Sequence, residues 1–218
     1  MESMRFVPEL QKGSPEYMED RIDIWRSIID HSHTHGRELT PGRIGPVRDL
    51  AFANKEGEEC HGTEEFVYGG KTAGVNREVY ALNIFANCKM QAELRYHIYD
   101  GVIKISQANT SPQYQGYGMN SRLFQDMSDL HPDIMCVYTN LDDSNIEVYM
   151  SNVQKGMDPV IAARYTPAGK VRERAGWRLD EDRSWLARWD KDIGKLVAKD
   201  GKQLHGPVRL NYRRDAIE

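Results

Sequence analysis

Apolar residues near the beginning of the chain recur at the spacing of an amphipathic helix. The residues on this face are Ile22, Trp25, Ile28 and Ile29. Ser14 and Pro15 precede them, as an N-cap residue followed by a proline at the first helical position. We therefore predict a helix over residues 15–31.

Residues 36–76 show no comparable period. This segment is rich in Gly, Glu and Lys, and prolines at positions 41 and 46 interrupt it. We predict loops here, around a short helix near residues 47–54.

Strands are predicted after this segment. Residues 79–85 and 92–99 are rich in β-branched and aromatic side chains, and residues 102–108 alternate apolar and polar positions. Asp100 and Gly101 separate the second run from the third, and this pair suits a type I′ turn, whose two central residues need positive φ. The pattern predicts three antiparallel strands in sequence order.

The next segment has the pattern of a helix, a strand and a second helix. Residues 119–130 have a helical period, and residues 134–138 form an apolar run typical of a strand buried on both faces. Residues 142–144 then cap a helix that ends at Gly156. We predict a last strand over residues 160–165.

The end of the chain predicts one more helix, near residues 182–199. Its apolar positions are Trp185, Trp189, Ile193, Leu196 and Val197. The two tryptophans, one helical turn apart, would dock this helix onto the rest of the chain or offer a platform for a nucleobase. We therefore divide the chain into one domain over residues 1–169 and a charged C-terminal extension over residues 170–218 that carries the helix.

Composition narrows the class of protein. Hydrophobic residues make up 39% of the 218 residues and charged residues 28%, as in folded soluble proteins. The chain lacks both an apolar run of about 18 residues and the apolar segment of a signal peptide, so we expect a cytoplasmic protein without a membrane span. The formal net charge of -4 argues against duplex nucleic acid as the main partner and leaves a cationic amine open. The sequence does not fix the oligomeric state, and a dimer is compatible with it.

Cysteine and histidine usage gives little sign of a metal or a disulfide. Three cysteines at irregular spacing form neither a disulfide framework nor a zinc ribbon, and Cys136 is expected in the core. The histidines at positions 31, 33 and 35 would need a further ligand, such as Cys60 or His61, to bind zinc. Histidines are also favoured at the end of a helix by its dipole, so we expect no metal site.

The loop at residues 112–121 carries the strongest chemical signal. Gly116 and Gly118 lie between a predicted strand and a predicted helix, where bare backbone and the helix N-terminus can hold a pyrophosphate. Such a turn is also a common tight connection. The segment lacks the lysine of a P-loop and the third glycine of a dinucleotide-binding fingerprint.

Residues 113–118 match the Q/R-x-x-G-x-G/A signature, and here the sequence resembles the GNAT family of acetyl-CoA-dependent N-acetyltransferases. The likeness continues through the strand at 134–138, Asn145 near the start of the next helix, and Lys155-Gly156-Met157 at its end. It covers residues 78–165. It implies an α+β GNAT acyltransferase fold: a mixed, mostly antiparallel twisted sheet flanked by helices, with a V-shaped splay between two central strands.

The resemblance also implies how acetyl-CoA, the acyl donor, would be bound. Backbone groups of Ile105, Ser106 and Gln107 would pair with the pantetheine amides, and Asn145 would lie beside the pantetheine arm. The pyrophosphate would lie on the loop and the helix start, whose residues are Gln113, Gln115, Gly116, Tyr117, Gly118 and Met119.

The catalytic residues follow less directly from the resemblance. The family often has a tyrosine that protonates the departing thiolate, and Asn152 occupies that position here. Tyr149, one helical turn earlier, could take this role, or it could be a core residue while Asn152 or a water serves. Glu93 is a candidate general base, because attack needs a neutral amine, although a solvated strand face would explain it equally well.

The implied function is transfer of an acetyl or other short acyl group from acetyl-CoA to an amine, by direct attack in a ternary complex. The sequence does not identify the amine acceptor. Two alternatives stay open: an acyltransferase that modifies an aminated nucleobase or tRNA, and a CoA-binding module of the same fold without catalysis.

Overall fold

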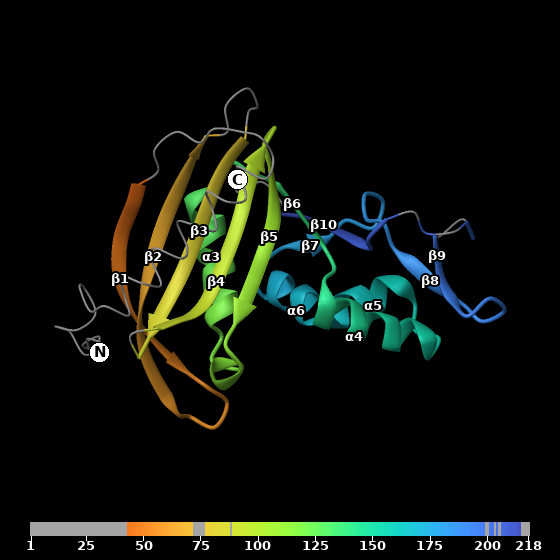
Figure 1. Cartoon of the computed structure of the whole chain (residues 1–218), viewed down its shortest axis with the longest axis horizontal. Coiled ribbons are helices and arrows are strands. Elements are labelled where there is room, and N and C mark those ends of the chain that lie inside the picture. The colour runs from red at the N-terminus through yellow and green to blue at the C-terminus, as the bar shows by residue number, and fades with distance from the viewer. Residues whose placement is uncertain are drawn as a thin grey trace. The chain divides into compact units, whose positions relative to one another are not determined.

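The computed structural model describes residues 43–71, 77–87, 89–198, 201–202, 204 and 206–214 (Figure 1). The helix predicted over residues 15–31 and the three histidines that follow it lie outside the described residues. The chain divides into two compact units. The first comprises Met1–Asp100 and Ile105–Met127, and the second comprises Gly101–Lys104 and Ser128–Glu218.

The first unit is built on a sheet of long strands. In spatial order these are β1 (Arg43–Ala53), β2 (Glu59–Lys71), β3 (Arg77–Ala86), β4 (Lys89–Tyr99) and β5 (Val102–Thr110). The pairs β1–β2, β2–β3 and β3–β4 are antiparallel. Each strand follows its sequence neighbour, so each pairing closes only a short loop, which keeps the entropic cost of the sheet low.

The turn between β4 and β5 has the conformation that the sequence predicts. Asp100 has φ 47° and Gly101 has φ 72°, so both central residues are in the left-handed region. Aspartate tolerates this region and glycine adopts it freely, which explains this pair at this place.

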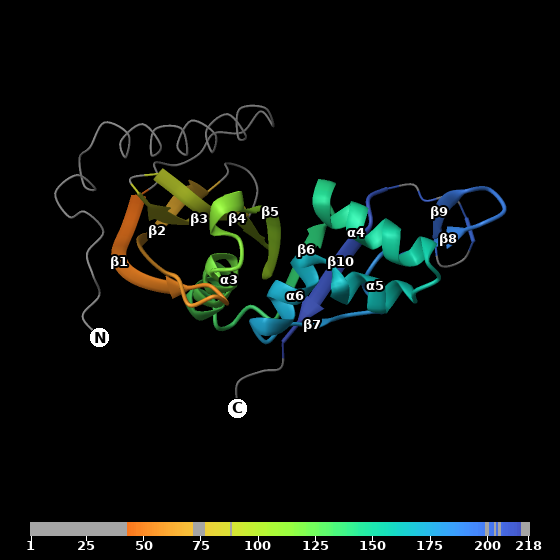
Figure 2. The ribbon, with the colours of Figure 1, turned by 90° about the horizontal axis from the view of Figure 1, so that it is seen from below.

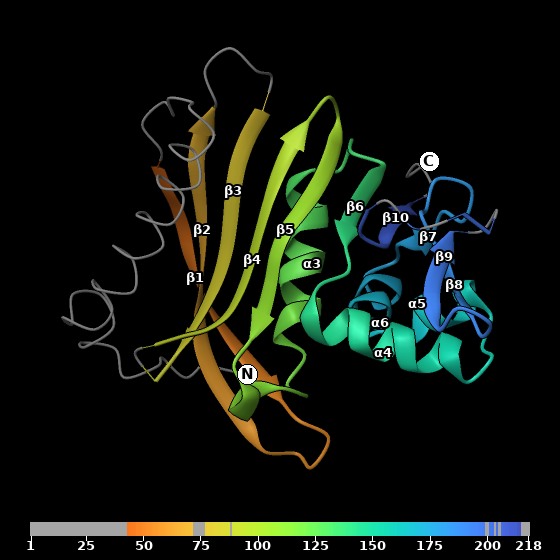
Figure 3. The ribbon, with the colours of Figure 1, turned by 45° about the vertical axis from the view of Figure 1, so that its right-hand side comes forward.

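The helix α3 (Met119–Leu130) confirms the predicted helix and lies against one face of this sheet (Figures 2 and 3). Leu123, Phe124 and Met127 of α3 are at most 1% exposed. Burying a side chain of this size contributes about 1.5–3 kcal/mol, so these three residues fix the helix to the unit. The buried strand residues of this unit include Leu82, Ile84, Leu94 and Tyr96.

The second unit combines short strands with three helices. The helices are α4 (Asp143–Gln154), α5 (Pro159–Tyr165) and α6 (Pro167–Arg174), and the strands are β6 (Cys136–Asn140), β7 (Arg178–Leu179), β8 (Ala187–Asp190), β9 (Lys195–Ala198) and β10 (Arg209–Arg213). The strand β10 pairs antiparallel with both β6 and β7. The start of β5 pairs parallel with β6 through Val102–Cys136, Ile103–Val137 and Lys104–Tyr138.

The strand pairings are therefore mostly antiparallel with one parallel pair, and with the helices they confirm the predicted α+β class. The V-shaped splay concerns strand segments of different units and stays a prediction. The end of α4 also agrees with the sequence, because Gly156 has φ 88° directly after it.

The strand predicted over residues 160–165 is wrong, because this segment is helix α5. Asp158 caps the helix: its Oδ1 accepts hydrogen bonds from Val160 N at 2.8 Å and Ile161 N at 3.3 Å. Pro159 occupies the first helical position, where its missing N–H costs nothing. The apolar run over residues 160–163 led to the strand prediction, although Asp158 and Pro159 before it are typical of a helix start.

The helix predicted near residues 182–199 is also wrong. The segment forms the antiparallel hairpin of β8 and β9, in which Ala187 pairs with Ala198 and Trp189 with Leu196. Gly194, with φ 61°, lies in the connecting turn. Trp185 is 54% exposed, so it does not dock a helix. Apolar residues three and four positions apart are typical of a helix, but the same spacing also occurs when the residues lie on the two strands of a hairpin with a tight turn.

Two boundaries also differ from the sequence prediction. Within residues 36–76, where loops and a short helix were expected, Arg43–Ala53 and Glu59–Lys71 are the strands β1 and β2. The strand predicted at 134–138 begins at Cys136 instead, and its residues alternate between buried and half-buried. Cross-strand partners decide both cases, and their identity is not a local property of the sequence.

The predicted domain division at residue 169 stays a prediction; the second compact unit begins at Ser128 and also takes in residues 101–104. Residues of the expected extension complete the second unit. The strand β10 lies beside β6, with Tyr212 paired to Val137. Trp177 is 1% exposed, and its Nε1 donates to Ser128 Oγ at 2.9 Å.

Candidate functional site

The glycine loop lies between β5 and α3 in the first unit. A short 3-10 helix, η1 (Pro112–Tyr114), leads into it. Gly116 has φ 93° and Gly118 has φ 80°, so a side chain at either position would strain the backbone. A Cβ built on either glycine would meet no atom within 4 Å. Glycine is therefore needed at both positions for the backbone conformation. The space above the backbone is open, as a site for a ligand requires.

The start of α3 supplies hydrogen-bond donors to this space. The first helical bond runs from Arg122 N to Gly118 O at 3.0 Å. The N–H groups of Met119, Asn120 and Ser121 precede that bond and have no partner within the helix. Together with the positive end of the helix dipole, they favour an anion at the loop.

Neighbouring strands hold the loop in place. Ser111 N donates to Gln91 O of β4 at 2.8 Å. The hydroxyl of Tyr114, which is 8% exposed, accepts from Asn87 Nδ2 at 2.5 Å. The ring of Tyr114 lies 5.7 Å from that of Tyr117, centroid to centroid. The loop is therefore fixed before any ligand arrives, which reduces the entropic cost of binding.

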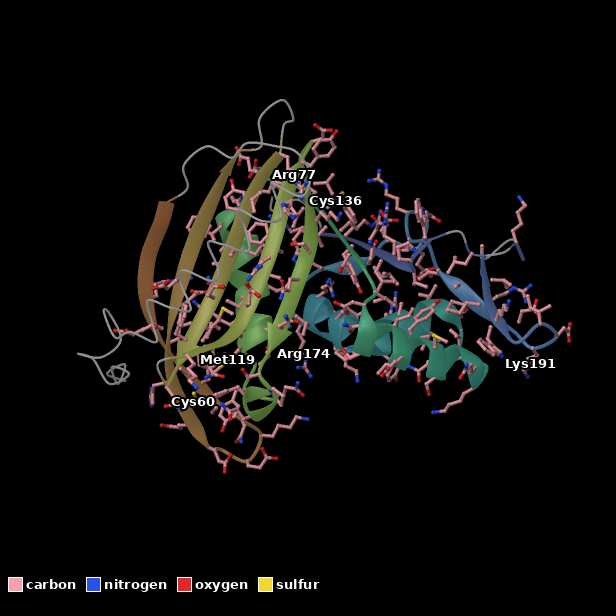
Figure 4. All side chains as sticks on the ribbon, in the orientation of Figure 1. Cys60, Arg77, Met119, Cys136, Arg174 and Lys191 are labelled. Carbon is pink, nitrogen blue, oxygen red and sulfur yellow. The ribbon has the colours of Figure 1, made fainter. Side chains whose placement is uncertain are left out.

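The turn between β1 and β2 also reaches this loop. The Tyr117 hydroxyl donates to Glu58 Oε2 at 3.4 Å, and Cys60 of β2 is hydrogen-bonded to Tyr114. Figure 4 shows Cys60 and Met119 at the same end of the sheet. Burial raises the pKa of the Cys60 thiol, and the bond to Tyr114 opposes this shift. A thiol with a raised pKa is a weak nucleophile near pH 7.

The arginine in the first turn of α3 is bonded to a carboxylate of the same helix. Arg122, in the first turn of α3, directs its Nε to Asp126 Oδ2 at 2.6 Å. Its guanidinium is thus held by a carboxylate one helical turn later. Of the other predicted donor-site residues, Gln113 and Gln115 are exposed and Ile105 is buried. Ser106 is exposed and donates from Oγ to Arg95 O at 3.1 Å, and Gln107 is half-buried.

Three more of the predicted residues, Asn145, Tyr149 and Asn152, lie on α4, in the second unit. Asn145 uses both ends of its amide: Nδ2 donates to Asp142 Oδ1 at 2.9 Å, and Oδ1 accepts from Ala168 N at 2.8 Å. This links the start of α4 to α6. To bind the pantetheine arm through its amide, Asn145 would have to give up one of these two hydrogen bonds for a bond to the ligand.

Tyr149 is buried, and its hydroxyl is occupied in both directions. It donates to Ala187 O at 2.5 Å and accepts from Ala187 N at 3.0 Å. Burial raises the pKa of this phenol to about 12, and the bond to Ala187 opposes the shift. The hydroxyl therefore ties α4 to β8. Asn152, the alternative, is half-buried at the other end of the same helix.

Glu93 lies on β4 and is 2% exposed, so the interpretation of a solvated strand face is wrong. Burial raises the pKa of its carboxyl, and Arg95, whose Nε is bonded to Oε1, opposes this shift. A raised pKa brings a carboxylate closer to what a general base needs near neutral pH. The register of β3 places Asn83 beside Glu93, and that of β2 places Glu65 beside Asn83. Sequence reasoning missed both, because only strand pairing brings them together.

Two buried acids, Glu64 of β2 and Asp126 of α3, share one arginine. Arg48 Nη2 lies 2.5 Å from Glu64 Oε2 and 2.9 Å from Asp126 Oδ1, which links β1, β2 and α3. The pKa of Glu64 is raised to about 7. Burial is the largest cause, and the neighbouring Asp126 adds to it. The ion pairs of Arg48 with Glu64 and Asp126 therefore help to attach α3 to the sheet.

Among the described residues, His, Cys, Asp and Glu side chains form no group arranged to hold a metal ion. Cys136 is half-buried, with its Sγ 3.7 Å from Arg183 Nη1. Trp185 carries the guanidinium of Arg209 on its ring, with the carbon 4.1 Å from the ring centroid. In the part of the chain that the structure describes, no helix is long and apolar enough to cross a membrane.

The chain matches no family model and no curated protein. Solved structures resemble it at low identity. One is a putative GNAT-family acetyltransferase from Desulfovibrio desulfuricans, 12% identical over 64% of this chain and 70% of that chain, with a TM-score of 0.39. A second is a PaiA N-acetyltransferase from Thermoplasma acidophilum in complex with coenzyme A, 8% identical over 62% of this chain and 60% of that chain, with a TM-score of 0.37. A third is the ribosomal-protein-S18-alanine N-acetyltransferase from Escherichia coli, 13% identical over 63% of this chain and 69% of that chain, with a TM-score of 0.37. All three are named as acetyltransferases, and each is at most 13% identical to this chain.

Proposed function

We propose that this protein is an N-acyltransferase that moves an acetyl or other short acyl group from acetyl-CoA to an amine acceptor. The observation that carries the proposal is the glycine loop. Two left-handed glycines leave open space above the backbone, directly before a helix whose first N–H groups have no partner within the helix. Such a cradle suits the pyrophosphate of coenzyme A.

In this proposal the residues of the first unit bind the acyl donor. Backbone N–H groups from Gln115 to Met119 hold the pyrophosphate. Arg122, in the first turn of the helix, is bonded to Asp126. The backbone of β5 around Ser106 then pairs with the pantetheine amides as an added strand would.

The chemistry requires one proton acceptor and one proton donor. The neutral amine nitrogen attacks the thioester carbonyl carbon, an N–C bond forms, and the C–S bond breaks. Glu93 takes the proton that the nitrogen loses, directly or through water, and its buried carboxyl with a raised pKa suits this task. The departing sulfur takes a proton from a water molecule, since the Tyr149 hydroxyl is already bonded to Ala187.

Binding of the donor is tested with one glycine variant and a matched control. Gly118→Val adds a branched side chain at φ 80° in the loop, and Gly194→Val adds the same strain at φ 61° in the β8–β9 turn. A Cβ at either position meets no atom within 4 Å, so both variants fold with similar losses of stability. We expect acetyl-CoA to raise the melting temperature of wild type and Gly194→Val, and to leave Gly118→Val unchanged.

Turnover is tested separately, by thiol release with a panel of primary amines. Stabilisation of Gly118→Val by acetyl-CoA to the wild-type extent would refute the assigned cradle. Binding of acetyl-CoA without thiol release for any amine would instead favour a CoA-binding module without catalysis. The two measurements therefore separate donor binding from catalysis.

A further inference from the structure

The paired strands β6 and β10 of the second unit bury one face and leave the other partly exposed. Val137, Leu210 and Tyr212 are at most 1% exposed. Helix α6 packs on this buried face, where the guanidinium of Arg172 lies over the ring of Tyr212. The residues that alternate with them project to the other face, which we call the open face, and are half-buried or exposed: Cys136, Tyr138, Asn140, Arg209, Asn211 and Arg213. These six positions include two arginines and no carboxylate.

Arg209 is held on the open face by neutral groups. Its Nε donates to Asn140 Oδ1 at 3.3 Å. Its guanidinium carbon lies 4.1 Å from the ring centroid of Trp185 and 5.1 Å from that of Tyr138. A guanidinium has five N–H donors, and the amide of Asn140 uses one of them. Fixed in this orientation, the other donors match the oxygens of a phosphate, which a guanidinium binds in a planar, two-bonded geometry.

Two further arginines lie at the open face. Arg213, at the exposed end of β10, follows Arg209 by four residues, about 13 Å along the strand. Arg183 directs its Nη1 to Cys136 Sγ at 3.7 Å and its Nε to Asp180 Oδ2 at 3.8 Å, so a carboxylate balances its charge. Within the described part of the chain, neither Arg209 nor Arg213 is paired with a carboxylate. The open face therefore offers two positive charges to an anionic ligand.

Trp185 adds an aromatic surface beside these charges. Its ring side chain is exposed, at 54% for the residue, but its backbone is fixed to β10: Trp185 N donates to Arg209 O at 2.8 Å, and Arg209 N donates to Trp185 O at 3.1 Å. A single exposed aromatic residue is common on protein surfaces. Next to a guanidinium without a paired carboxylate, it supplies the second of two groups that bind a nucleotide, a plane on which a base stacks.

We propose that the open face, together with Trp185, binds single-stranded nucleic acid. A base stacks on the Trp185 ring, Arg209 binds the phosphate next to that base, and Arg213 binds a phosphate further along the strand. The separation of about 13 Å between the two arginines favours a chain with repeated phosphates over one nucleotide. The bases of a duplex are stacked on one another, so a duplex offers none to Trp185. This inference does not rest on the proposed function.

The test measures binding of a short, fluorescently labelled oligoadenylate to the full chain by fluorescence anisotropy, without acetyl-CoA. Two phosphate contacts on a single strand predict a slope of about −1.4 for the logarithm of the association constant against the logarithm of the salt concentration. We expect the single strand to bind at least tenfold more tightly than its duplex with oligouridylate. Adenosine monophosphate should compete at least tenfold less well than the unlabelled strand, and polyglutamate, which has charges but no bases, should not compete.

Removing the ring locates the stacking surface. We expect Trp185→Ala to weaken binding about fivefold to 150-fold, as loss of one base–aromatic stack does. The variant folds, because the exposed ring is lost while the backbone bonds to Arg209 remain. Tyr165→Ala is the matched control and should leave binding unchanged. Tyr165 is also 54% exposed and has the Lys170 ammonium 5.6 Å from its ring centroid, but it lies on α5.

Charge variants locate the phosphate contacts. Arg213→Gln removes one contact, and we expect the salt slope to fall in magnitude by about 0.7. Lys195→Gln is its control, because Lys195 is an exposed cation of β9 and its loss changes the net charge equally. Arg209→Lys keeps the charge and loses the planar donor fork, so it should weaken binding about threefold to tenfold with little change in slope.

The inference would be overturned if the single strand did not bind, if the duplex bound as tightly, or if either Trp185→Ala or Arg213→Gln matched wild type in affinity and salt slope. If Trp185→Ala did not fold, Arg213→Gln would decide alone. Polyglutamate competing as well as the unlabelled strand would make the open face a site for acidic peptides, and adenosine monophosphate competing as well would make it a nucleotide site. Gly118→Val should bind oligoadenylate like wild type, so this inference and the proposed function fail separately.

Discussion

Replacing Tyr149 by Phe tests whether this hydroxyl serves catalysis or structure. The substitution removes one oxygen that is 0% exposed and bonded to both Ala187 N and Ala187 O. It leaves a buried N–H and a buried carbonyl to find new partners. Each unpaired buried group costs about 1–3 kcal/mol, so we expect the two groups together to lower the free energy of unfolding by about 2–6 kcal/mol. For a chain of this length that corresponds to a fall of about 4–24 °C in melting temperature.

The same geometry predicts a small effect on turnover. The pKa of the Tyr149 phenol is about 12, and a thiol has a reference pKa of about 8.5. Transfer of the phenolic proton to the thiolate would be uphill by about 5 kcal/mol. We therefore expect kcat of the folded Tyr149→Phe protein to change less than about threefold.

Urea unfolding followed by circular dichroism measures the stability, and thiol release at 15 °C measures kcat where the variant is folded. Tyr165→Phe is the control, because Tyr165 is 54% exposed and loss of its hydroxyl should change stability by less than about 0.5 kcal/mol. A Tyr149→Phe protein with wild-type stability and kcat reduced 10-fold to 100-fold would refute this reasoning. It would return the role of proton donor to Tyr149.

Two further predictions concern the acid pair and the end of the chain. Because the pKa of Glu64 is raised to about 7, the folded protein binds an extra proton between about pH 4.5 and pH 7, so stability falls as the pH rises through this window. Melting curves from pH 5 to pH 8 should show a steeper fall for wild type than for Glu64→Gln, and parallel curves would contradict the assignment. Ending the chain after Pro167 removes β10 and with it the partner of β6, so we expect loss of cooperative unfolding in the second unit. A shortened chain that keeps the wild-type melting temperature and loses only acceptor use would instead make this segment a substrate-binding element.

Local chemistry determined several elements in advance. The positive φ of Asp100 and Gly101 follows from the residue pair itself, and the helix at 119–130 follows from its apolar period. The glycine loop belongs to this group, because Gly116 and Gly118 can adopt a conformation that other residues reach only with strain. A conformation set by one or two residues can be read from those residues.

One error had a local signal that the apolar run concealed. Residues 160–165 form a helix, and Asp158 with Pro159 before them is a helix start written in the sequence. The errors at 47–54 and 182–199 are of another kind. These segments are strands because partners elsewhere in the chain pair with them, and a pattern of apolar residues does not name its partner.

The sequence by itself determined the glycine loop and Glu93 as candidates, and only the tertiary structure decided what surrounds them. Tyr149 and Asn145 have residue types that suit a donor site, yet their hydrogen bonds to Ala187 and Ala168 came with the packing of α4. The pairing of Glu65, Asn83 and Glu93 depends on the register of three strands, in which a slip of one residue would send each side chain to the other face. Register is fixed by the burial of both faces together, so no stretch of sequence taken alone could place these three side chains in one row.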